Sequence, residues 1–532
     1  MVESSFLRAS EQGHMPGMVN RAFRMMAGTF ASRVLGLLRE VLTAGFFGAT
    51  RSLDAFYVAY TLANLSRQLL AEGALSASFV PVFSRVQKRD GNAAALLLAR
   101  QVLTILLAVG TAFVLIGFFI SPLLVAVIAP GFTGKESALA LTLTRALFPF
   151  LLLVSVGALA MGVLNSTGSF FIPAVAPAAS NLAFIVILLF MHRHISIWVL
   201  VWAVLFGGAC NMLLQWFWAD RLGMRLTPAL PHMKNRDLKE TLALFLPYAA
   251  GLSLNQINPV IGRVLGSYLE DGVISVLNYA DRIIQLPLGL FVIAISQAVL
   301  PMLSKVDRDD REEFRRFIRD ALRFNLFVVL PAAIGLIMAS RPIVHILLVR
   351  GAFDEWAWIA TSGALACYAA GLPGISCNTV LMRALYARSL PRAAINVMLL
   401  TVCTNLAVGL LLMRYISYRG LALGASCAFT VAAFAGAWCL SKNLGCRLVL
   451  FEGKWVAKLL VSCLVMTSGL AGFSFLFPYP LASSFSVRFI WLFALVTIGI
   501  LLYTLTTLLL RCSEWLWIRQ ALAGKKDREG AL

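Results

Sequence analysis

The stretch VLTILLAVGTAFVLIGFFISPLLVAVIAP, residues 102–130, decides the class of fold. It carries no charged side chain and is longer than the about 20 residues that a helix needs to cross a bilayer. Its apolar residues follow one another without the alternation at every second position that a membrane β-barrel strand requires. Because lipid offers no hydrogen-bond partner to an open backbone, the stretch predicts a membrane-spanning helix.

The whole chain shares this apolar composition. Of its 532 residues, 60% are hydrophobic and only 13% are charged. A soluble globular protein is about 25% charged, so the composition excludes a water-soluble enzyme, and the long apolar runs exclude a disordered chain. The formal net charge is +20. In so apolar a chain this surplus predicts basic loops beside an anionic leaflet, with anionic membrane lipids as partners and no nucleic acid bound.

Further apolar stretches of similar length occur from end to end of the chain. Helices are expected throughout, since each stretch is of spanning length. The expected spans are residues 22–47, 54–83, 95–128, 137–165, 170–191, 196–219, 240–267, 273–303, 317–340, 356–386, 392–413, 418–441, 455–477 and 486–510.

The basic residues predict the orientation of these spans. Lys and Arg gather in the segments before the odd-numbered spans and after the last one, whereas the opposite loops hold few. The positive-inside rule then places both termini in the cytoplasm, in agreement with an even number of spans. Residues 1–21 are polar and lack the apolar core of a signal peptide, so the first span is expected to stay as an anchor.

The chain also repeats itself. SASFVPVFSRV (76–86) resembles SQAVLPMLSKV (296–306), and Phe148–Pro149 is echoed by Leu372–Pro373. Six spans separate the copies, so both halves run in the same direction through the membrane. The sequence therefore predicts an all-α polytopic membrane protein of about fourteen transmembrane helices. Two six-helix lobes related by a parallel pseudo-repeat surround a central cavity, and two C-terminal helices follow; a packed bundle without a cleft is the alternative.

These features divide the chain into six expected regions. They are a cytoplasmic N-terminal segment at 1–21, an N-lobe at 22–219, a cytoplasmic linker at 220–239, a C-lobe at 240–441, the last two helices within 455–510, and a basic cytoplasmic tail at 511–532. The last two helices are predicted either to hold a lipid tail in a groove or to be a peripheral packing pair.

Ionisable side chains are concentrated where the bilayer disfavours them. Each costs about 2.5–3.5 kcal/mol at mid-membrane on insertion scales, so such groups usually face water, one another or a ligand. Arginine stays charged and offers a planar fork for phosphate. An arginine excess in the first two spans of each half therefore predicts a cationic cavity that attracts an anionic substrate. The arginines are Arg33, Arg39, Arg67, Arg263 and Arg282.

Acidic and amide side chains accompany these arginines. Asp54 is expected either to exchange charge partners or simply to cap a helix. Asp281 and Arg282 are either part of the site or a self-neutralising pair. Glu40 and Glu72 are expected to pair with arginines, and Asn64 shares a face with Arg67.

Arg33 and Arg39 raise a geometric question. They lie about 120° apart on an ideal helix. Either Gly36 permits a bend or the two arginines point to different places.

Motifs of catalysis are missing from the sequence. There is no Walker A loop, HExxH, nucleophile elbow or CxxC, so we expect no enzyme, no cofactor and no metal site. The sequence allows a coupling ion, and no motif in it specifies which one. A membrane-embedded glycosyl- or phosphotransferase would need metal-binding carboxylates, and Asp309–Asp310 is the candidate pair. Because basic residues surround this pair in the sequence, we interpret it as the solvated start of a helix.

Several segments together resemble the MurJ/MviN family of bacterial lipid II flippases, within the multidrug/oligosaccharidyl-lipid/polysaccharide exporter superfamily. They are SRVLGLLRE (32–40), LDAFYVAYTLANLSRQLLAEGALSASFVPVFS (53–84), APGF (129–132) and NYADRIIQLPLGLFVIAISQAVLP (278–301). The resemblance covers spans one to twelve. It implies movement of undecaprenyl-diphosphate-linked peptidoglycan precursor from the cytoplasmic to the periplasmic leaflet by alternating access, in the bacterial cytoplasmic (inner) membrane.

The resemblance also implies roles for residues. The family's required arginines match Arg33 and Arg39, its acidic residue at the start of span two matches Asp54, and its Asp–Arg pair matches Asp281 and Arg282. It further implies that the last two helices hold the polyprenyl tail. The chain departs from the family pattern in having Arg67–Gln68 for a double Arg, Gln285 for Glu, and Glu40 for Asp.

Two other functions fit the sequence less well. A flippase for another polyprenyl-linked glycan differs only in the headgroup. A cation-coupled drug exporter of the same superfamily should have acidic and aromatic cavity residues, contrary to the arginine excess.

Overall fold

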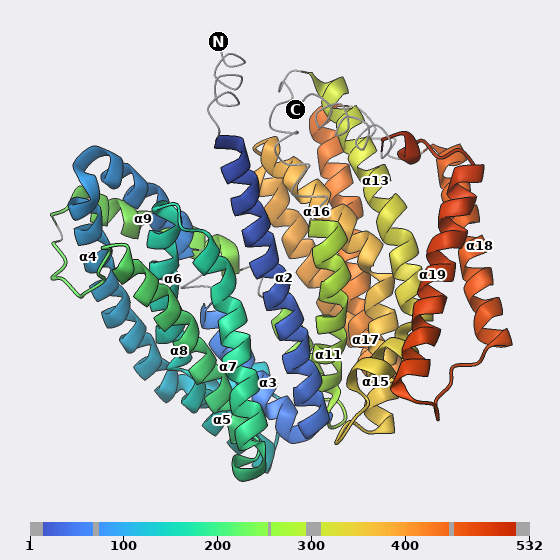
Figure 1. Cartoon of the computed structure of the whole chain (residues 1–532), viewed down its shortest axis with the longest axis horizontal. Helices are drawn as coiled ribbons and strands as arrows, with labels where there is room; N and C mark the ends of the chain where they lie inside the picture. The colour runs from blue at the N-terminus through green and yellow to red at the C-terminus, as the bar shows by residue number, and fades with distance from the viewer. Residues whose placement is uncertain are drawn as a thin grey trace. The chain divides into compact units, whose positions relative to one another are not determined.

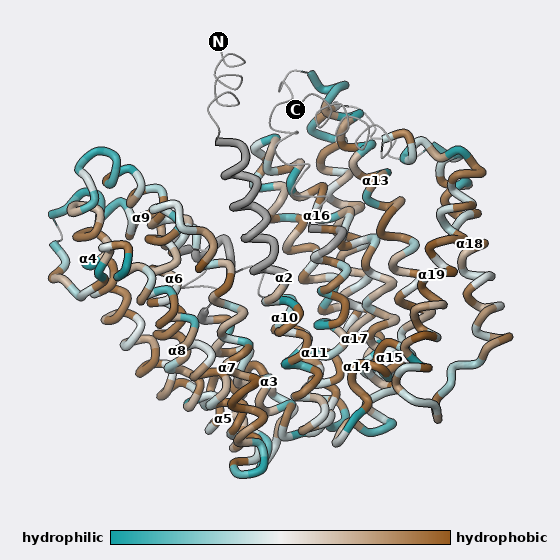
Figure 2. Tube along the Cα trace, viewed as in Figure 1, coloured by the Kyte–Doolittle hydropathy of each residue, from teal (hydrophilic) through white to brown (hydrophobic). Residues whose placement is uncertain are grey.

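The computed structural model describes residues 14–67, 74–232, 234–253, 257–293, 310–445 and 452–517. Over these ranges the chain is helical and contains no β-strand, which confirms the all-α expectation. Eight helices in this part of the chain are long and apolar enough to cross a membrane, or nine if one bent pair counts as a span. The hydrophobic residues follow the helices and the hydrophilic ones gather at turns (Figures 1 and 2). The full count of fourteen stays a prediction.

The chain divides into two compact units, Met1–Ser275 and Val276–Leu532. The sequence placed the division earlier, in the linker at 220–239. The first unit is larger because the helix after the linker packs on it. The lobe boundaries inferred from the repeat stay a prediction.

The first unit begins with a single long helix. α2 runs from His14 to Phe47 without a break and packs on α7. The other helices are α3 (Arg51–Arg67), α4 (Ala74–Ile128), α5 (Gly134–Leu147), α6 (Phe150–Ser166), α7 (Phe171–Ile195), α8 (Trp198–Arg221), α9 (Arg236–Ser253) and α10 (Ile257–Gly266).

Two of the helical stretches are interrupted. At Gly91 the backbone of α4 has φ 84° and ψ 178°, so the segment is two helices joined at a turn that glycine adopts without a Cβ penalty. α5 and α6 are separated at Phe148–Pro149, where the proline lacks the amide hydrogen that would continue the ladder. The two helices together, Gly134–Ser166, form one stretch long and apolar enough to cross a membrane, in agreement with the span expected at 137–165, and the break inside it was not expected.

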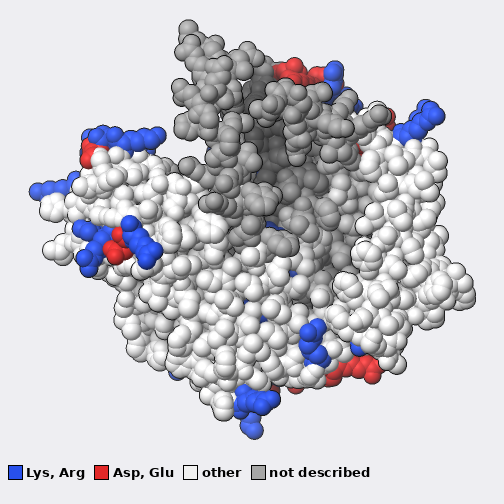
Figure 3. All heavy atoms as spheres, in the orientation of Figure 1, with Lys and Arg blue, Asp and Glu red and all other residues white. Residues whose placement is uncertain are grey.

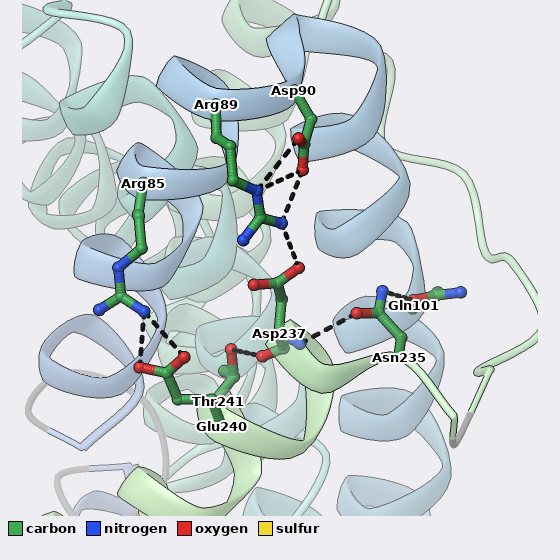
Figure 4. Close-up of polar contacts among 8 residues, drawn as sticks. All are labelled: Arg85, Arg89, Asp90, Gln101, Asn235, Asp237, Glu240 and Thr241. Atoms are coloured by element: carbon green, nitrogen blue, oxygen red, sulfur yellow. Dashed lines mark hydrogen bonds and ion pairs between the residues drawn. The ribbon is translucent and has the colours of Figure 1, made fainter.

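α9 packs against α4 and explains the position of the unit boundary. Leu238 of α9 is buried in the same core as Phe83 and Leu98 of α4. Two ion pairs reinforce this contact at its polar end: Arg85 with Glu240 at 2.8 Å, and Arg89 with Asp237 at 2.9 Å (Figure 4).

Arg89 also contacts the acid next to it in the chain. It donates hydrogen bonds to Asp90, which lower the pKa of that carboxyl below its usual value.

The second unit continues from α11 (Val273–Pro287), whose start belongs to the first unit, into the π-helical turn η3 (Leu288–Ile293). Its bent pair, α15 and α16, turns by 42° beside Leu372–Pro373, the counterpart of the break at Phe148–Pro149. The two copies of the sequence repeat therefore each contain a helix break beside the same proline position. The remaining helices are α13 (Arg311–Met338), α14 (Ser340–Leu348), α15 (Glu355–Ala370), α16 (Leu372–Ala387), α17 (Pro391–Leu444), α18 (Gly453–Leu476) and α19 (Phe485–Leu509).

α17 contains both of the spans expected at 392–413 and 418–441. It bends at Ile416 and Ser417, and Ser417 has φ 48°. The two limbs approach so closely that a Cβ on Gly424 would lie 2.8 Å from the backbone of Gly409. Glycine at this position lets the limbs pack backbone to backbone.

α18 and α19 pack on each other and on α13. Trp455, Leu459 and Leu495 are buried in a core with Phe327 of α13, and the Tyr503 hydroxyl donates to the Phe327 carbonyl at 2.7 Å. Their outer faces carry exposed apolar side chains. On the face shown in Figure 3, charged groups of each unit gather toward the helix ends. This is the distribution expected of helices that face lipid, and the lipid-tail groove stays a prediction.

Candidate functional site

Arg39 of α2 lies in a polar contact group that joins α2, α3 and α7. Its guanidinium forms an ion pair with Glu40 at 2.7 Å and donates to Asn181 Oδ1 of α7 at 3.3 Å. Phe184 covers the guanidinium, 5.0 Å from its ring centroid. The side chain is 18% exposed. Arg39 is therefore oriented by three neighbours, two of which come from α7.

Glu40 is the buried anion of this group. It accepts a hydrogen bond from the Tyr57 hydroxyl of α3 at 3.0 Å in addition to its pair with Arg39. Asn181 in turn donates to the backbone carbonyl of Ser32 at 3.0 Å. Burying a charge is favourable only when it is paired and hydrogen-bonded, and both ions meet this condition. The expectation that Glu40 pairs with an arginine agrees with this geometry.

Arg33 lies on a different face of α2. The helix continues through Gly36 without a break, so the two arginines keep the angular separation of an ideal helix. Arg33 is exposed, whereas Arg39 is packed against α7. A Cβ on Gly36 would meet the Asn181 amide nitrogen at an ordinary contact distance of 3.5 Å, and Gly36 introduces no bend.

Asp54 is fully buried in the first turn of α3, yet it does not cap that helix. Its carboxylate accepts from the backbone N–H groups of Gly272 at 2.8 Å and Ser275 at 2.7 Å, and from the Ser275 hydroxyl at 2.6 Å. These donors lie at the start of α11. The side chain therefore caps a helix more than 200 residues away in sequence, where an anion is also favoured by the helix dipole.

Two arginines strengthen the same connection. Arg51 of α3 donates to the carbonyls of Ser267 and Leu269 and lies 3.4 Å from Asp271. Arg263 of α10 donates to the Thr61 hydroxyl of α3 and to the Ile274 carbonyl, each at 3.2 Å. The start of α3 is thus held to the turn between α10 and α11 through charged side chains on both sides.

Asp281 and Arg282 lie on α11 beside Gln285. The Gln285 amide donates to Asp281 at 2.7 Å, and Arg282 donates to the Gln285 carbonyl oxygen at 3.4 Å. Gln285 therefore bridges the two charged residues. Gln285, which stands where the family pattern has Glu, therefore contacts both members of this pair.

The other predicted residues are less well defined. Asn64 is half-buried on α3. Arg67 ends α3, and its side chain lies outside the described residues, as does all of Glu72. Asp310 caps α13 by accepting from the Glu313 N–H at 2.8 Å, which supports its interpretation as a helix start.

Sequence reasoning missed several partners. Arg51, Tyr57 and Ser275 carried no signal in the sequence that pointed to these contacts. Asn181 was not among the predicted site residues. Their importance depends on contacts between helices far apart in sequence, such as the 142 residues that separate Arg39 and Asn181.

Long apolar helices with charged groups held among them define an integral membrane protein of the transporter class. A solved structure titled "Lipid II flippase MurJ, inward closed conformation" is similar with a TM-score of 0.76 at 25% identity, covering 92% of this chain and 98% of that one. An inward-facing MATE family multidrug transporter of the MOP superfamily shares the fold with a TM-score of 0.65 at 15% identity, over 78% of this chain and 94% of its own.

The family follows from the sequence comparison. The model of the family described as "Lipid II flippase MurJ" matches residues 43–504, so the chain belongs to that family. The lipid II flippase MurJ of Burkholderia cenocepacia is 34% identical over 399 residues, 72% of this chain and 77% of the relative. A probable lipid II flippase MurJ of Buchnera aphidicola is 30% identical over 480 residues, 89% of this chain and 93% of the relative.

Proposed function

We propose that this protein is a lipid II flippase, which carries undecaprenyl-diphosphate-linked peptidoglycan precursor from the cytoplasmic to the periplasmic leaflet of the bacterial cytoplasmic membrane. The observation that carries the proposal is the family match over residues 43–504. The fold and the arginines held among apolar helices support it. The protein acts as a transporter and not as an enzyme.

The diphosphate is the part of the substrate that lipid excludes most strongly, because it carries concentrated negative charge. Arg33 is the first candidate to bind it, since its side chain is exposed. Arg39, Arg263 and Arg282 are further candidates, and Asn64 would contact sugar hydroxyls. Arg39 would bind while keeping its contacts with Glu40 and Asn181, which fix the direction of its guanidinium.

Transport by alternating access requires contacts that form in one state and break in another. The capping of α11 by Asp54 is a suitable contact, because its three hydrogen bonds join α3 to the start of α11 through polar groups that can exchange partners. Arg51 and Arg263 would be released in the same step. Asp54 and Glu72 could then pair with arginines vacated by the substrate, which resets the carrier.

The basic loops place both termini in the cytoplasm and bring anionic lipids to the cytoplasmic face. The last two helices would hold the polyprenyl tail on their exposed apolar faces. The membrane potential supplies about 2.3 kcal/mol per charge per 100 mV, enough to drive a coupled ion whose identity is open.

The decisive experiment measures lipid II outside the membrane. Spheroplasts of a bacterium depleted of its own lipid II flippase would be given this protein, and the precursor would be cleaved by an externally added probe. Restored cleavage and growth are the expected result. Growth without exposed lipid II would contradict lipid II as the substrate. Exposure of a different polyprenyl-linked glycan alone would identify that glycan as the substrate instead. Restored efflux of a cationic dye without either would favour a drug exporter.

A further inference from the structure

The segment between α8 and α9 has an unusual relation to α4. Residues 222–232 are not helical beyond a turn, yet their backbone is bound by α4 side chains. Thr104 donates to the Ala229 carbonyl at 2.7 Å and accepts from the Ala229 N–H at 3.0 Å. Arg100 donates to the Arg225 carbonyl at 2.9 Å. The segment, seen as the green loop beside α4 in Figure 1, is therefore fixed on the surface of the first unit.

Two markers place this segment at the edge of the hydrocarbon layer. The uncharged stretch of α4 begins at Val102, beside the residues that bind the segment. In α8, Trp198 and Trp216 are 18 residues apart, about 27 Å along the helix, close to the thickness of the hydrocarbon core. Tryptophan concentrates at membrane interfaces. The segment follows directly after the second of these markers.

The apolar side chains of the segment point in two directions. Met224 and Leu226 are buried in the core of the first unit, 5% and 2% exposed. Leu230, between Ala229 and Pro231, is 88% exposed, the most of any large apolar side chain among the described residues. Because the backbone on which it sits is hydrogen-bonded to α4, the segment can lie against lipid without leaving those backbone groups unsatisfied.

Basic residues flank Leu230 on both sides in the sequence. Arg225 is 76% exposed, with Asp220 as a weak partner at 3.9 Å. The acids at the start of α9 are occupied, since Asp237 and Glu240 pair with arginines of α4 (Figure 4). Residues 221–236 contain no acidic side chain. The exposed basic residues of this surface are Arg221, Arg225, Lys234, Arg236 and Lys239.

We propose that residues 222–232, together with Lys234 and Arg236, form an interfacial membrane element that binds anionic phospholipid. Leu230 inserts among the acyl chains, and Arg225, Lys234 and Arg236 bind the phosphate groups of the surrounding headgroups. An exposed apolar side chain on a segment with exposed basic residues before and after it has the chemistry that favours an anionic leaflet over a zwitterionic one. The inference rests on the proposed cytoplasmic position of this segment and is independent of the transported substrate.

Lipid bound to this segment would also restrain α9, the helix that follows it. The segment leads directly into α9, and α9 is joined to α4 by exposed ion pairs. A leaflet that holds the segment therefore holds the first turn of α9 at the membrane surface.

Lipid selectivity can be measured by native mass spectrometry of the full chain in detergent. Phosphatidylglycerol and phosphatidylcholine of the same acyl composition would be titrated separately. We expect phosphatidylglycerol to bind more tightly, and each of Arg225→Ala and Lys234→Ala to weaken it roughly fivefold. Arg193→Ala is the matched control and should have no effect, because this exposed arginine lies in the last turn of α7, which precedes the start of α8, whereas the segment follows the end of α8. Equal affinity for the two lipids, or no loss in the first two variants, would overturn the inference.

Insertion of Leu230 needs its own measurement. In a background with the native cysteines replaced, Leu230→Cys and Lys239→Cys would each carry an environment-sensitive fluorophore in phosphatidylglycerol nanodiscs. The label at position 230 should show blue-shifted emission and quenching by acyl-chain spin labels, and the label at 239 should not. Aqueous emission at both positions would reject insertion and would point to a protein partner at Leu230. Lipid II exposure would be measured in the same variants. It tests the proposed flippase function by itself, because that function requires neither insertion of Leu230 nor its absence.

Discussion

At the scale of single residues, Arg39 has the most specific surroundings. We predict that Arg39→Ala abolishes lipid II exposure, because it removes the guanidinium and leaves Glu40 buried without its cation. Removing one partner of a buried pair costs about 3–5 kcal/mol, so stability must be followed together with transport. The measurement is complementation of a flippase-depleted strain, with immunoblots of the membrane fraction.

Arg39→Lys keeps the charge and separates folding from transport. It should insert normally and transport poorly, since an ammonium group lacks the planar fork that contacts both Glu40 and Asn181. A fully active Arg39→Ala would remove this residue from the proposed mechanism.

Asp54 acts on a helix far from its own position in sequence. We predict that Asp54→Asn lowers the free energy of unfolding by about 1–3 kcal/mol, because an amide nitrogen would face donors that need an acceptor. Ser275→Ala removes only the hydroxyl donor and should cost about 1 kcal/mol. Thermal unfolding in detergent measures both. Equal stability of Asp54→Asn and the unmodified protein would show that the three hydrogen bonds add nothing.

At the scale of elements, the bend in α17 depends on backbone packing. We predict that Gly424→Ala destabilises the protein by about 1–3 kcal/mol, because its Cβ would press on the backbone of Gly409. Gly472→Ala in α18 meets nothing within 4 Å and should be neutral or stabilising by up to about 1 kcal/mol. Thermal unfolding should show a lower midpoint for Gly424→Ala than for the unmodified protein, and an equal or higher midpoint for Gly472→Ala. A tolerated Gly424→Ala would mean that the limbs can separate at little cost.

At the scale of the whole molecule, a cluster in the second unit connects α14, the loop before α19 and α19 itself. His345 Nδ1 lies 3.0 Å from the Tyr479 hydroxyl and 3.2 Å from Arg488 Nη1. Because arginine only donates, Nδ1 must accept, and His345 is neutral in this arrangement. Burial, followed by the charge of Arg488, lowers the pKa of His345.

The sign of the pH dependence follows from this lowered pKa. The unfolded chain binds a proton near the ordinary histidine pKa of about 6.5, where folded His345 does not. The contribution of His345 to stability is therefore complete above that pH and falls as the pH is lowered through it. Thermal unfolding at pH 7.5 and 5.0 should show an acid loss that is smaller in His345→Asn. His232→Asn, an exposed histidine, is the control, and equal acid losses in all three proteins would contradict the prediction.

Much of the fold could be predicted from the sequence because its causes are local. An apolar run such as residues 102–130 has one favourable structure in lipid whatever surrounds it. The recurrence of Phe148–Pro149 as Leu372–Pro373 was visible in the sequence, and the structure added that a helix break lies beside each of these prolines. The sequence also showed which residue types were out of place in the bilayer, among them Arg39 and Asp54.

Only the tertiary structure decided what those residues contact. Arg39 meets Asn181, Asp54 caps α11 at Ser275, and Leu230 is exposed on a segment bound to α4. Each contact depends on where helices distant in sequence pack against one another, and no local pattern encodes that position. By itself the sequence determined that the protein is polytopic and helical and that several of its membrane spans contain ionisable side chains. Packing decided which of those charges hold helices together and which are left exposed to bind.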